Sequence, residues 1–320
     1  VLPDLNARVA RTGENPVAAR AGGPLEYGPL LTRITMNDAS ATSETPWDLL
    51  LPLLACPDCG GDVSRRNENV DCRGCGSSFP VRDGIPVFAR FGTVEEPTGA
   101  KPAQTSEKYQ QNYQDVGEAA LYNKMYTSRF SKRWSTQREF TLLERLLSSQ
   151  PRCKALLDLP CGGGRLSPQI ARYTDLLIES DIALGQVQYG RQHGRVPETR
   201  QFWMTASGFH IPLKAASVDG VVCVRLSHHL PTAAERERLL RELLRVSRRF
   251  VIMTFFDHHS LKNLGRRLRR PLDGKPPKMT MTVGRVRELA AEGGADLVAC
   301  PVLSHLGSGH RYALMVKRAT

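Results

Sequence analysis

The sequence lacks a long apolar run. No segment approaches the roughly 18 consecutive apolar residues that a membrane-spanning helix needs, which excludes an integral membrane protein. Residues 1–24 have no apolar stretch behind a basic start, so they do not read as a secretory signal. We therefore expect a chain without a membrane span, located in the cytoplasm, and Met36 is an alternative to Val1 as the native start.

Cysteine is present, but its distribution does not favour a disulfide framework. Eight cysteines occur in 320 residues, and four of them form two C-x2-C pairs that are separated by twelve residues. Glycine follows each pair and permits a tight turn around the sulfur atoms. Four thiolates complete a tetrahedral zinc site and leave no position for a catalytic water. The pattern predicts a structural zinc ion, with two disulfides or unpaired thiols as the alternative, at Cys56, Cys59, Cys72 and Cys75.

Acidic residues are few relative to basic ones. Lys and Arg number 44 against 32 Asp and Glu, which gives a formal net charge of +12 and favours an anionic partner such as RNA, acidic lipid or a phosphorylated metabolite. Part of the excess lies in an expected insertion, residues 257–279, where LKNLGRRLRRPLDGKPPK has seven basic residues and one Asp. This insertion could bind phosphate, a lipid headgroup or RNA, or simply form a solvated surface helix.

Composition divides the chain into four parts. Residues 1–45 lack periodicity and are expected to be disordered, residues 46–92 form the cysteine-bearing domain, residues 93–106 form a linker, and residues 107–320 form the largest domain. In the last part, short apolar strands alternate with helices, which predicts an α/β fold with a Rossmann-like, doubly wound, mostly parallel sheet. The final two apolar runs are joined only by SHLGSGH, so they are expected to form an antiparallel hairpin.

A glycine-rich loop follows the first of these strands, at LLDLPCGGGR (residues 156–165). The run resembles the first motif of the class I S-adenosylmethionine (SAM) dependent methyltransferases of type 11, with Pro160 in place of the first glycine. Gly162 and Gly164 then let the backbone approach the cofactor, a helix from Gly164 favours its carboxylate, and Asp158 holds its amino group. A nicotinamide enzyme is disfavoured because the third glycine of its motif is absent and Asp158 would face a pyrophosphate.

The same resemblance implies further cofactor contacts. Asp181 lies 23 residues after Asp158, where the family places the acid that binds both ribose hydroxyls, with Glu179 as competitor and a helix N-cap as the plainer alternative. Ile182 would then lie against adenine. Where the family usually has an Asp after the third strand, this chain has Ser207, so backbone groups near Ser207 or Phe209 are expected to hold adenine.

The end of the fourth strand faces the methyl group in this family, which places Arg225, His228 and His229 within reach of the acceptor. A histidine could deprotonate a hydroxyl or nitrogen nucleophile near neutral pH, and an ordinary loop is the alternative. The Asn-Pro-Pro-Tyr motif and a cysteine pair for attack on a pyrimidine are both lacking, which disfavours base-amino and carbon-five methylation.

The cysteine-bearing segment also resembles a known protein family. LLPLLACPDCGG and FPVRDGIPVF resemble a small zinc-ribbon family whose free-standing members activate translation-related methyltransferases, which implies a ribbon fused in cis. The expected function is methyl transfer from SAM to a small or lipid-like metabolite. The alternatives are an RNA (rRNA or tRNA) methyltransferase that uses the ribbon and the basic insertion, and a non-catalytic scaffold. The acceptor atom and the oligomeric state are not determined by the sequence.

Overall fold

The computed structural model describes residues 45–89, 115–128, 130–194, 196, 201–273, 279–304 and 308–319, without the side chains of 122, 124–135 and 270–273. The stretch predicted to be disordered, apart from Thr45, and the predicted linker 93–106 lie outside the described residues. No helix in the described ranges combines the length and the apolar character that crossing a membrane would require.

The cysteine-bearing segment folds into a short helix and a small antiparallel sheet. Helix α1 (Pro46–Leu50) begins at a capping box in which Thr45 and Asp48 satisfy each other's backbone N–H groups, and a 3-10 turn, η1 (Leu51–Leu53), follows. The strands, in spatial order, are β1 (Val63–Arg66), β2 (Asn69–Cys72), β3 (Ser78–Arg82) and β4 (Ile85–Pro86). Because burial alternates along β3, Phe79 and Val81 point into the core of this segment.

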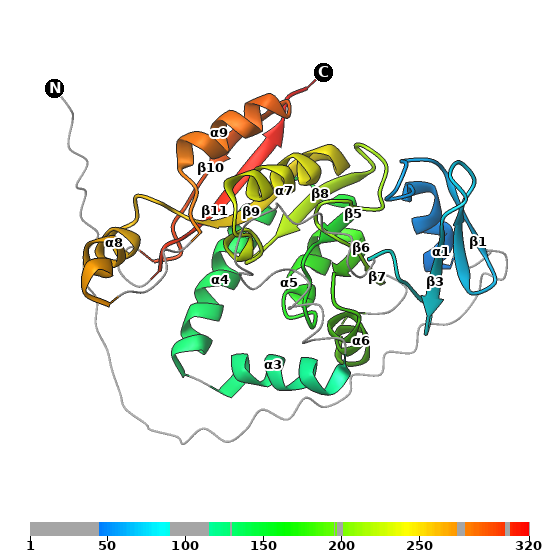
Figure 1. Ribbon diagram of the computed structural model, residues 1–320, viewed down its shortest axis with the longest axis horizontal. Helices are drawn as coiled ribbons and strands as arrows, with labels where there is room; N and C mark the ends of the chain where they lie inside the picture. The colour runs from blue at the N-terminus through cyan, green and yellow to red at the C-terminus, as the bar shows by residue number, and fades with distance from the viewer. Residues whose placement is uncertain are drawn as a thin grey trace, which may run out of the picture. The chain divides into compact units, whose positions relative to one another are not determined.

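The larger sheet has seven strands (Figure 1). They are β5 (Cys153–Asp158), β6 (Thr174–Asp181), β7 (Gln201–Thr205), β8 (Val218–Cys223), β9 (Ser247–Phe256), β10 (Ala295–Ala299) and β11 (His310–Lys317). Their order is β10-β11-β9-β8-β5-β6-β7, with β9 to β7 parallel and β11 antiparallel to both of its neighbours. The predicted doubly wound sheet with a C-terminal antiparallel hairpin is therefore confirmed.

Helices connect these strands and cover both faces of the sheet. They are α3 (Val116–Ser128), α4 (Phe130–Ser148), α5 (Ser167–Ile170), η2 (Ala171–Tyr173), α6 (Leu184–His193), η4 (Ser227–His229), α7 (Ala233–Val246), α8 (Leu261–Asp273) and α9 (Val283–Glu292). The helix expected from Gly164 begins only at Ser167, because Gly162 and Gly164 have positive φ and Pro168 favours the first turn of a helix. Its α-helical part is four residues long, so it offers little of the dipole that the sequence suggested.

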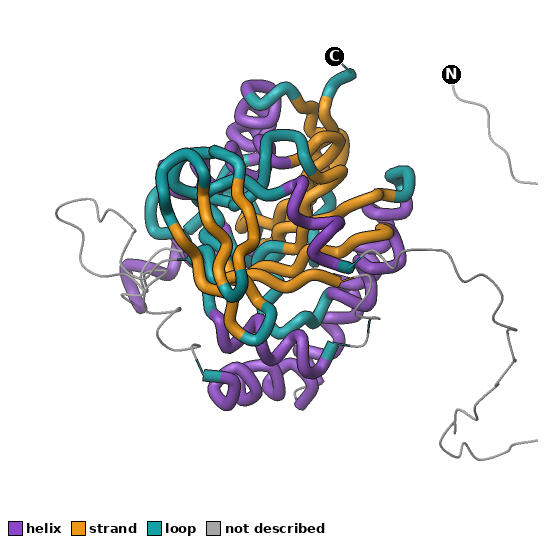
Figure 2. The backbone as a smooth tube through the Cα atoms, turned by 90° about the vertical axis from the view of Figure 1, so that its right-hand side faces the viewer, coloured by secondary structure: helices purple, strands orange, loops and turns teal. Residues whose placement is uncertain are grey.

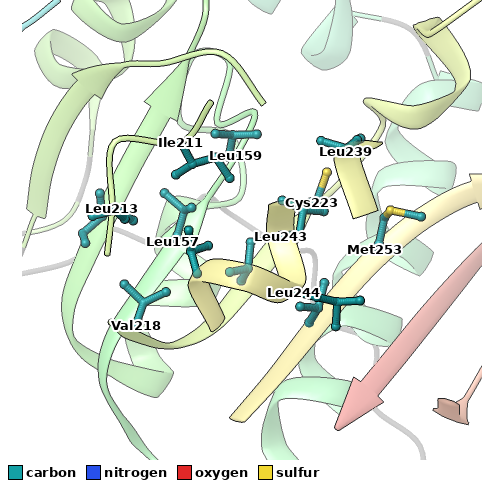
Figure 3. Close-up of a cluster of buried hydrophobic side chains, with 14 of the residues drawn as sticks. Leu157, Leu159, Ile211, Leu213, Val218, Cys223, Leu239, Leu243, Leu244 and Met253 are labelled. Atoms are coloured by element: carbon teal, nitrogen blue, oxygen red, sulfur yellow. The ribbon is translucent and has the colours of Figure 1, made fainter. Parts of the chain in front are cut away.

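Two apolar layers lie on opposite faces of the sheet. Residues of β5, β8 and β9 pack against α7 on one face, and Figure 3 shows the buried contacts of Leu157, Val218, Cys223, Leu243, Leu244 and Met253. On the other face Leu143 and Leu147 of α4 pack against Leu156 and Phe250. Since strand side chains alternate between the faces, Asp158 lies on the same face as Leu156.

The small sheet is joined to the edge strand β7 of the larger one. Phe88 N donates to Thr205 O at 3.1 Å and Ala89 N donates to Thr205 Oγ1 at 3.3 Å. Nearby, the rings of Trp47 and Phe202 meet edge to face with centroids 4.8 Å apart. One apolar core runs through both sheets, and in Figure 2 the small sheet lies in front of the larger one. The two sheets therefore fold against each other as parts of one compact unit.

Candidate active site

Four cysteine thiols converge in the small sheet. All four Sγ atoms lie within 4.8 Å of one another, with Cys56 and Cys75 3.7 Å apart and Cys59 and Cys72 3.5 Å apart. A tetrahedral site with Zn–S bonds of about 2.3 Å has edges of about 3.8 Å, whereas a disulfide bond is about 2.05 Å long. The backbone N–H groups of Gly61 and Gly74 donate to the sulfurs of Cys59 and Cys72. The donor set fits a structural zinc ion, as the sequence predicted.

The glycine-rich loop leaves the end of β5 immediately after Asp158. Gly162 and Gly164 have φ values of +53° and +74°, a region that side chains with a Cβ rarely adopt. A Cβ at Gly164 would also lie 3.0 Å from the indole of Trp203 in β7. Pro160, in place of the family's first glycine, is half-buried and follows a cis peptide bond. The loop therefore keeps the close backbone approach that the motif predicts, despite Pro160.

Three carboxylates are fully buried beside this loop. Asp158 ends β5, and Glu179 and Asp181 are among the last three residues of the neighbouring strand β6. Burial, together with the neighbouring Glu179 and Asp181, holds the pKa of Asp158 well above its usual range. Burial also raises the pKa of Glu179 to about 7 and that of Asp181 to about 6. Such a cluster destabilises its own ionised form and favours a cationic ligand.

Asp158 is the group that most needs a ligand. Neither of its carboxylate oxygens has a hydrogen-bond partner among the described residues. Oε2 of Glu179 also has no hydrogen-bond partner there. A buried polar atom without a partner costs about 1–3 kcal/mol, so native proteins usually satisfy such atoms. The ammonium and sulfonium groups of SAM supply the positive charge and the N–H donors that this cluster lacks. The residues present therefore fit the predicted cofactor.

Asp181 shapes the loop. Its Oδ2 accepts from Gly162 N and its Oδ1 from Ala183 N, both at 3.0 Å. Helix α6 has Ala183 as its N-cap, so Asp181 is not a helix cap. Each carboxylate oxygen keeps a second lone pair for another donor. The half-buried Ile182 follows directly, at the end of β6.

The predicted adenine contacts lie one strand further along. Ser207 and Phe209 are half-buried in the turn after β7, where Phe209 N donates to Ser207 Oγ at 3.3 Å. Since β5, β6 and β7 are adjacent and parallel, their carboxyl ends share one edge of the sheet. All the predicted cofactor residues therefore follow three neighbouring strands, as ligand sites in doubly wound sheets do.

The predicted acceptor residues follow β8, the neighbour of β5 on its other side. Arg225 has φ +67°, its N donates to Thr254 Oγ1 at 2.7 Å, and its Nε donates to Glu139 Oε1 at 2.8 Å. Glu139, which is buried in α4, also pairs with Arg165 at 2.7 Å and accepts from the Tyr312 hydroxyl at 2.7 Å. Burial opposes ionisation of Glu139, but Arg165 and Arg225 outweigh it and lower its pKa. Arg225 is thus held in a buried ion-pair network.

Aromatic and imidazole rings gather beside this network. The half-buried His228 lies with its ring centroid 4.2 Å from His229, 4.6 Å from Phe256 and 5.1 Å from His310. His229 is exposed. Burial, with a contribution from Arg225, lowers the pKa of His310 to about 4, so this ring is neutral at physiological pH. We call His228, His229, Phe256 and His310 the ring cluster.

The sequence did not indicate several of these residues. Glu139 and Tyr312 come from segments without a motif, and His310 joins the ring cluster because β11 pairs with β9, placing it opposite Phe256. Arg165 ends the glycine-rich motif, but nothing in the motif indicates its partner Glu139. The signal for His310 could have been the short SHLGSGH hairpin loop, which ends on it, had the strand order been known.

The small sheet also contacts the cofactor loop. Ile85 of β4 is buried in a cluster with Cys161 of the loop, Val187 of α6 and Trp203 of β7. Because Trp203 in turn packs against Gly164, the zinc-binding segment supports the cofactor loop through apolar contacts. The zinc-binding segment and the cofactor loop therefore belong to the same apolar cluster.

Comparison with known proteins gives matches for both parts of the chain. The Methyltransferase domain family matches residues 157–253. A UPF0434 protein of Hahella chejuensis is 45% identical over 56 residues, which are 16% of this chain and 93% of that protein. A UPF0434 protein of Photorhabdus laumondii is 44% identical over 50 residues, 15% of this chain and 85% of that protein.

Solved structures of a methyltransferase match about two thirds of this chain. Magnesium protoporphyrin IX methyltransferase from Synechocystis PCC 6803 with bound SAH is 18% identical, with a TM-score of 0.57 over 67% of this chain and 100% of that chain. The same enzyme with bound SAM is 17% identical, with a TM-score of 0.53 over 69% of this chain and 100% of that one. At this identity the likeness establishes the fold. The chain therefore belongs to the UPF0434 family through its N-terminal segment, and to that segment is joined a SAM-dependent methyltransferase.

Proposed function

We propose that the protein transfers the methyl group of SAM to a small or lipid-like metabolite. The observation that carries this proposal is the ring cluster, which lies after β8, at the end of β9 and at the start of β11. Strand β8 is the neighbour of β5, which ends in Asp158. Phe256 and His310, with centroids 4.2 Å apart, offer flat, weakly polar surfaces. Such surfaces favour an apolar or aromatic acceptor over a phosphodiester backbone.

Each group of residues has a separate role in this proposal. Asp158 and Glu179 hold the cationic methionyl end of the cofactor, and Asp181 uses its remaining lone pairs for the ribose hydroxyls. Ile182 and the turn at Ser207 and Phe209 hold adenine. These assignments are supported by the burial of the carboxylates and by the adjacency of β5, β6 and β7.

On the acceptor side, His228 or His229 takes the proton that the nucleophile loses. Both follow β8, and His229 is exposed enough to exchange that proton with water. Arg225, whose guanidinium pairs with Glu139, has a structural role: it holds the segment after β8 in place. SAM itself supplies an activated methyl group, so the chain mainly aligns the acceptor with it.

The second candidate is an RNA methyltransferase, which the basic helix α8 favours. Phosphate contacts weaken steeply with salt, so RNA binding through α8 would have to do the same. The two candidates are separated by incubating the protein with labelled SAM and with metabolite, lipid and RNA pools, followed by mass spectrometry. We expect label in the metabolite or lipid fraction. Label confined to RNA, in a salt-sensitive reaction, would replace the first proposal with the second.

The affinity for SAM is expected to depend on pH. The raised pKa of Glu179, about 7, means that this side chain is mostly protonated below neutrality and attracts a cation weakly. Affinity should rise roughly tenfold between about pH 5.5 and about pH 7.5. Over the same window the contribution of Glu179 to the stability of the cofactor-free protein should fall, because this side chain binds more protons in the folded state than in the unfolded state there.

Calorimetric titration and thermal unfolding across this pH window test both expectations. In Glu179→Gln the pH dependence of binding should become weaker, since one titrating group is gone, while Asp158 and Asp181, whose pKa values are also raised, remain. An unchanged pH dependence in that variant would show that Glu179 does not face the cofactor.

A further inference from the structure

Helix α8 exposes a row of leucines. The exposed fractions of Leu261, Leu264 and Leu268 are 61%, 41% and 72%. Their spacing of three and four residues places them on one face of the helix. Figure 1 shows α8 standing apart from α7 and α9, which cover the sheet. Large apolar side chains gathered at the surface mark an interaction site.

The leucines are flanked by cations. Arg266 donates to Asn263 Oδ1 at 3.1 Å and Arg269 to Gly265 O at 3.2 Å, while Arg267 contacts the ring of His258. These partners are uncharged groups or a weak base, so they do not neutralise the arginines. No Asp or Glu occurs from residue 258 to residue 272. The helix therefore combines an exposed leucine row with positive charge that is available to an anionic surface.

The first turn of α8 is fixed next to the ring cluster. Asn263, which is 4% exposed, donates through Nδ2 to Asp257 O at 2.8 Å. Asp257, also buried, pairs with Arg311 at 2.7 Å and its N donates to Gly309 O at 2.8 Å. Asp257 follows Phe256, and Gly309 precedes His310. The start of α8 is therefore hydrogen-bonded to the backbone next to two members of the ring cluster.

We propose that α8 docks in the plane of an anionic lipid bilayer surface, with Leu261, Leu264 and Leu268 at the acyl boundary and the arginines at acidic headgroups. A basic helix with an apolar face binds in this way by burying apolar area and attracting anionic lipid together. RNA would bind the arginines and leave the leucines in water. RNA binding therefore explains the positive charge of α8 but not its exposed leucine row. The docked helix would hold the ring cluster near the membrane, where a lipid-like acceptor is found.

The test is sedimentation of the full chain with vesicles, without SAM. Wild type should sediment with vesicles of mixed phosphatidylglycerol and phosphatidylcholine and stay in solution with phosphatidylcholine alone. The triple variant Leu261→Ser, Leu264→Ser and Leu268→Ser should bind the mixed vesicles roughly tenfold more weakly. Val298→Ser, which removes another exposed apolar side chain, from β10, is the matched control and should bind as wild type does.

A second pair of measurements separates lipid from RNA. Arg267→Gln with Arg269→Gln should also weaken vesicle binding, and added salt should do the same. The proposal is overturned if the wild-type protein does not sediment with anionic vesicles, or if the leucine variant binds them as well as wild type does. It is also overturned if only the arginine variant loses affinity and a labelled RNA displaces the vesicles. Because no cofactor is present, failure here is distinct from failure of the proposed methyl transfer, which the labelled-SAM incubation measures.

Discussion

Replacing Cys56 with serine is expected to remove zinc from the protein and to unfold the small sheet. Structural zinc contributes an apparent ~10–16 kcal/mol in zinc-finger peptides, far more than the small core of this segment can replace. Because one apolar core runs through both sheets, loss of the small sheet also uncovers Phe202 at the β7 edge. We expect a marked fall in the thermal unfolding temperature.

The same substitution should weaken SAM binding, since Ile85 supports Cys161 and Trp203 beside the cofactor loop. Elemental analysis, thermal unfolding and calorimetry measure the three effects. Cys300→Ser is the matched control, because that thiol is half-buried and lies outside the four-sulfur cluster. Zinc retained at its wild-type content in Cys56→Ser would contradict the metal assignment.

Asp158→Asn is expected to separate stability from binding. Without the carboxylate, the site loses one of its three fully buried acidic groups, and affinity for the cationic cofactor should fall about a hundredfold, equivalent to about 3 kcal/mol. The cofactor-free protein should be as stable as wild type or more so. The reason is that the substitution removes a buried acidic group whose oxygens have no partner among the described residues.

Calorimetry with SAM and thermal unfolding without it check the two halves of this prediction. Asp175→Asn is the control, because Asp175 lies near the start of the neighbouring strand β6, where its exposed side chain pairs with Arg152. Unchanged affinity in Asp158→Asn would remove Asp158 from the cofactor site. A large loss of stability would instead show that it holds the loop together.

Local patterns predicted much of this protein for physical reasons that act over short distances. The C-x2-C pairs place their thiols in tight turns, and Gly162 and Gly164, which follow β5, lack a Cβ and permit a close backbone approach, so both features follow from neighbouring residues. The alternation of apolar strands and helices predicted the parallel sheet, and the short SHLGSGH connection predicted the hairpin. Helix α7 also depends on neighbouring residues, because its leucines follow helical spacing after a capping box.

Other features depend on contacts between distant segments. The helix after the glycine loop was expected three residues too early, because the backbone conformation of Gly164 was not visible in its identity alone. Asp181 was predicted as a ribose ligand, but its bond to Gly162 arises only once β6 lies beside the loop. The roles of Asp181, His228 and His229 stay predictions until cofactor and acceptor binding are measured.

The sequence by itself determined the zinc ligands, the alternation of strands and helices, and the loop beside Asp158, because each rests on the spacing of residues close in the chain. Only the tertiary structure decided three further features. These are the pairing of Arg225 with Glu139, the place of His310 beside Phe256, and the contact of Ile85 with the cofactor loop. Each joins segments that are far apart in sequence, and such contacts form only when the sheets and helices pack.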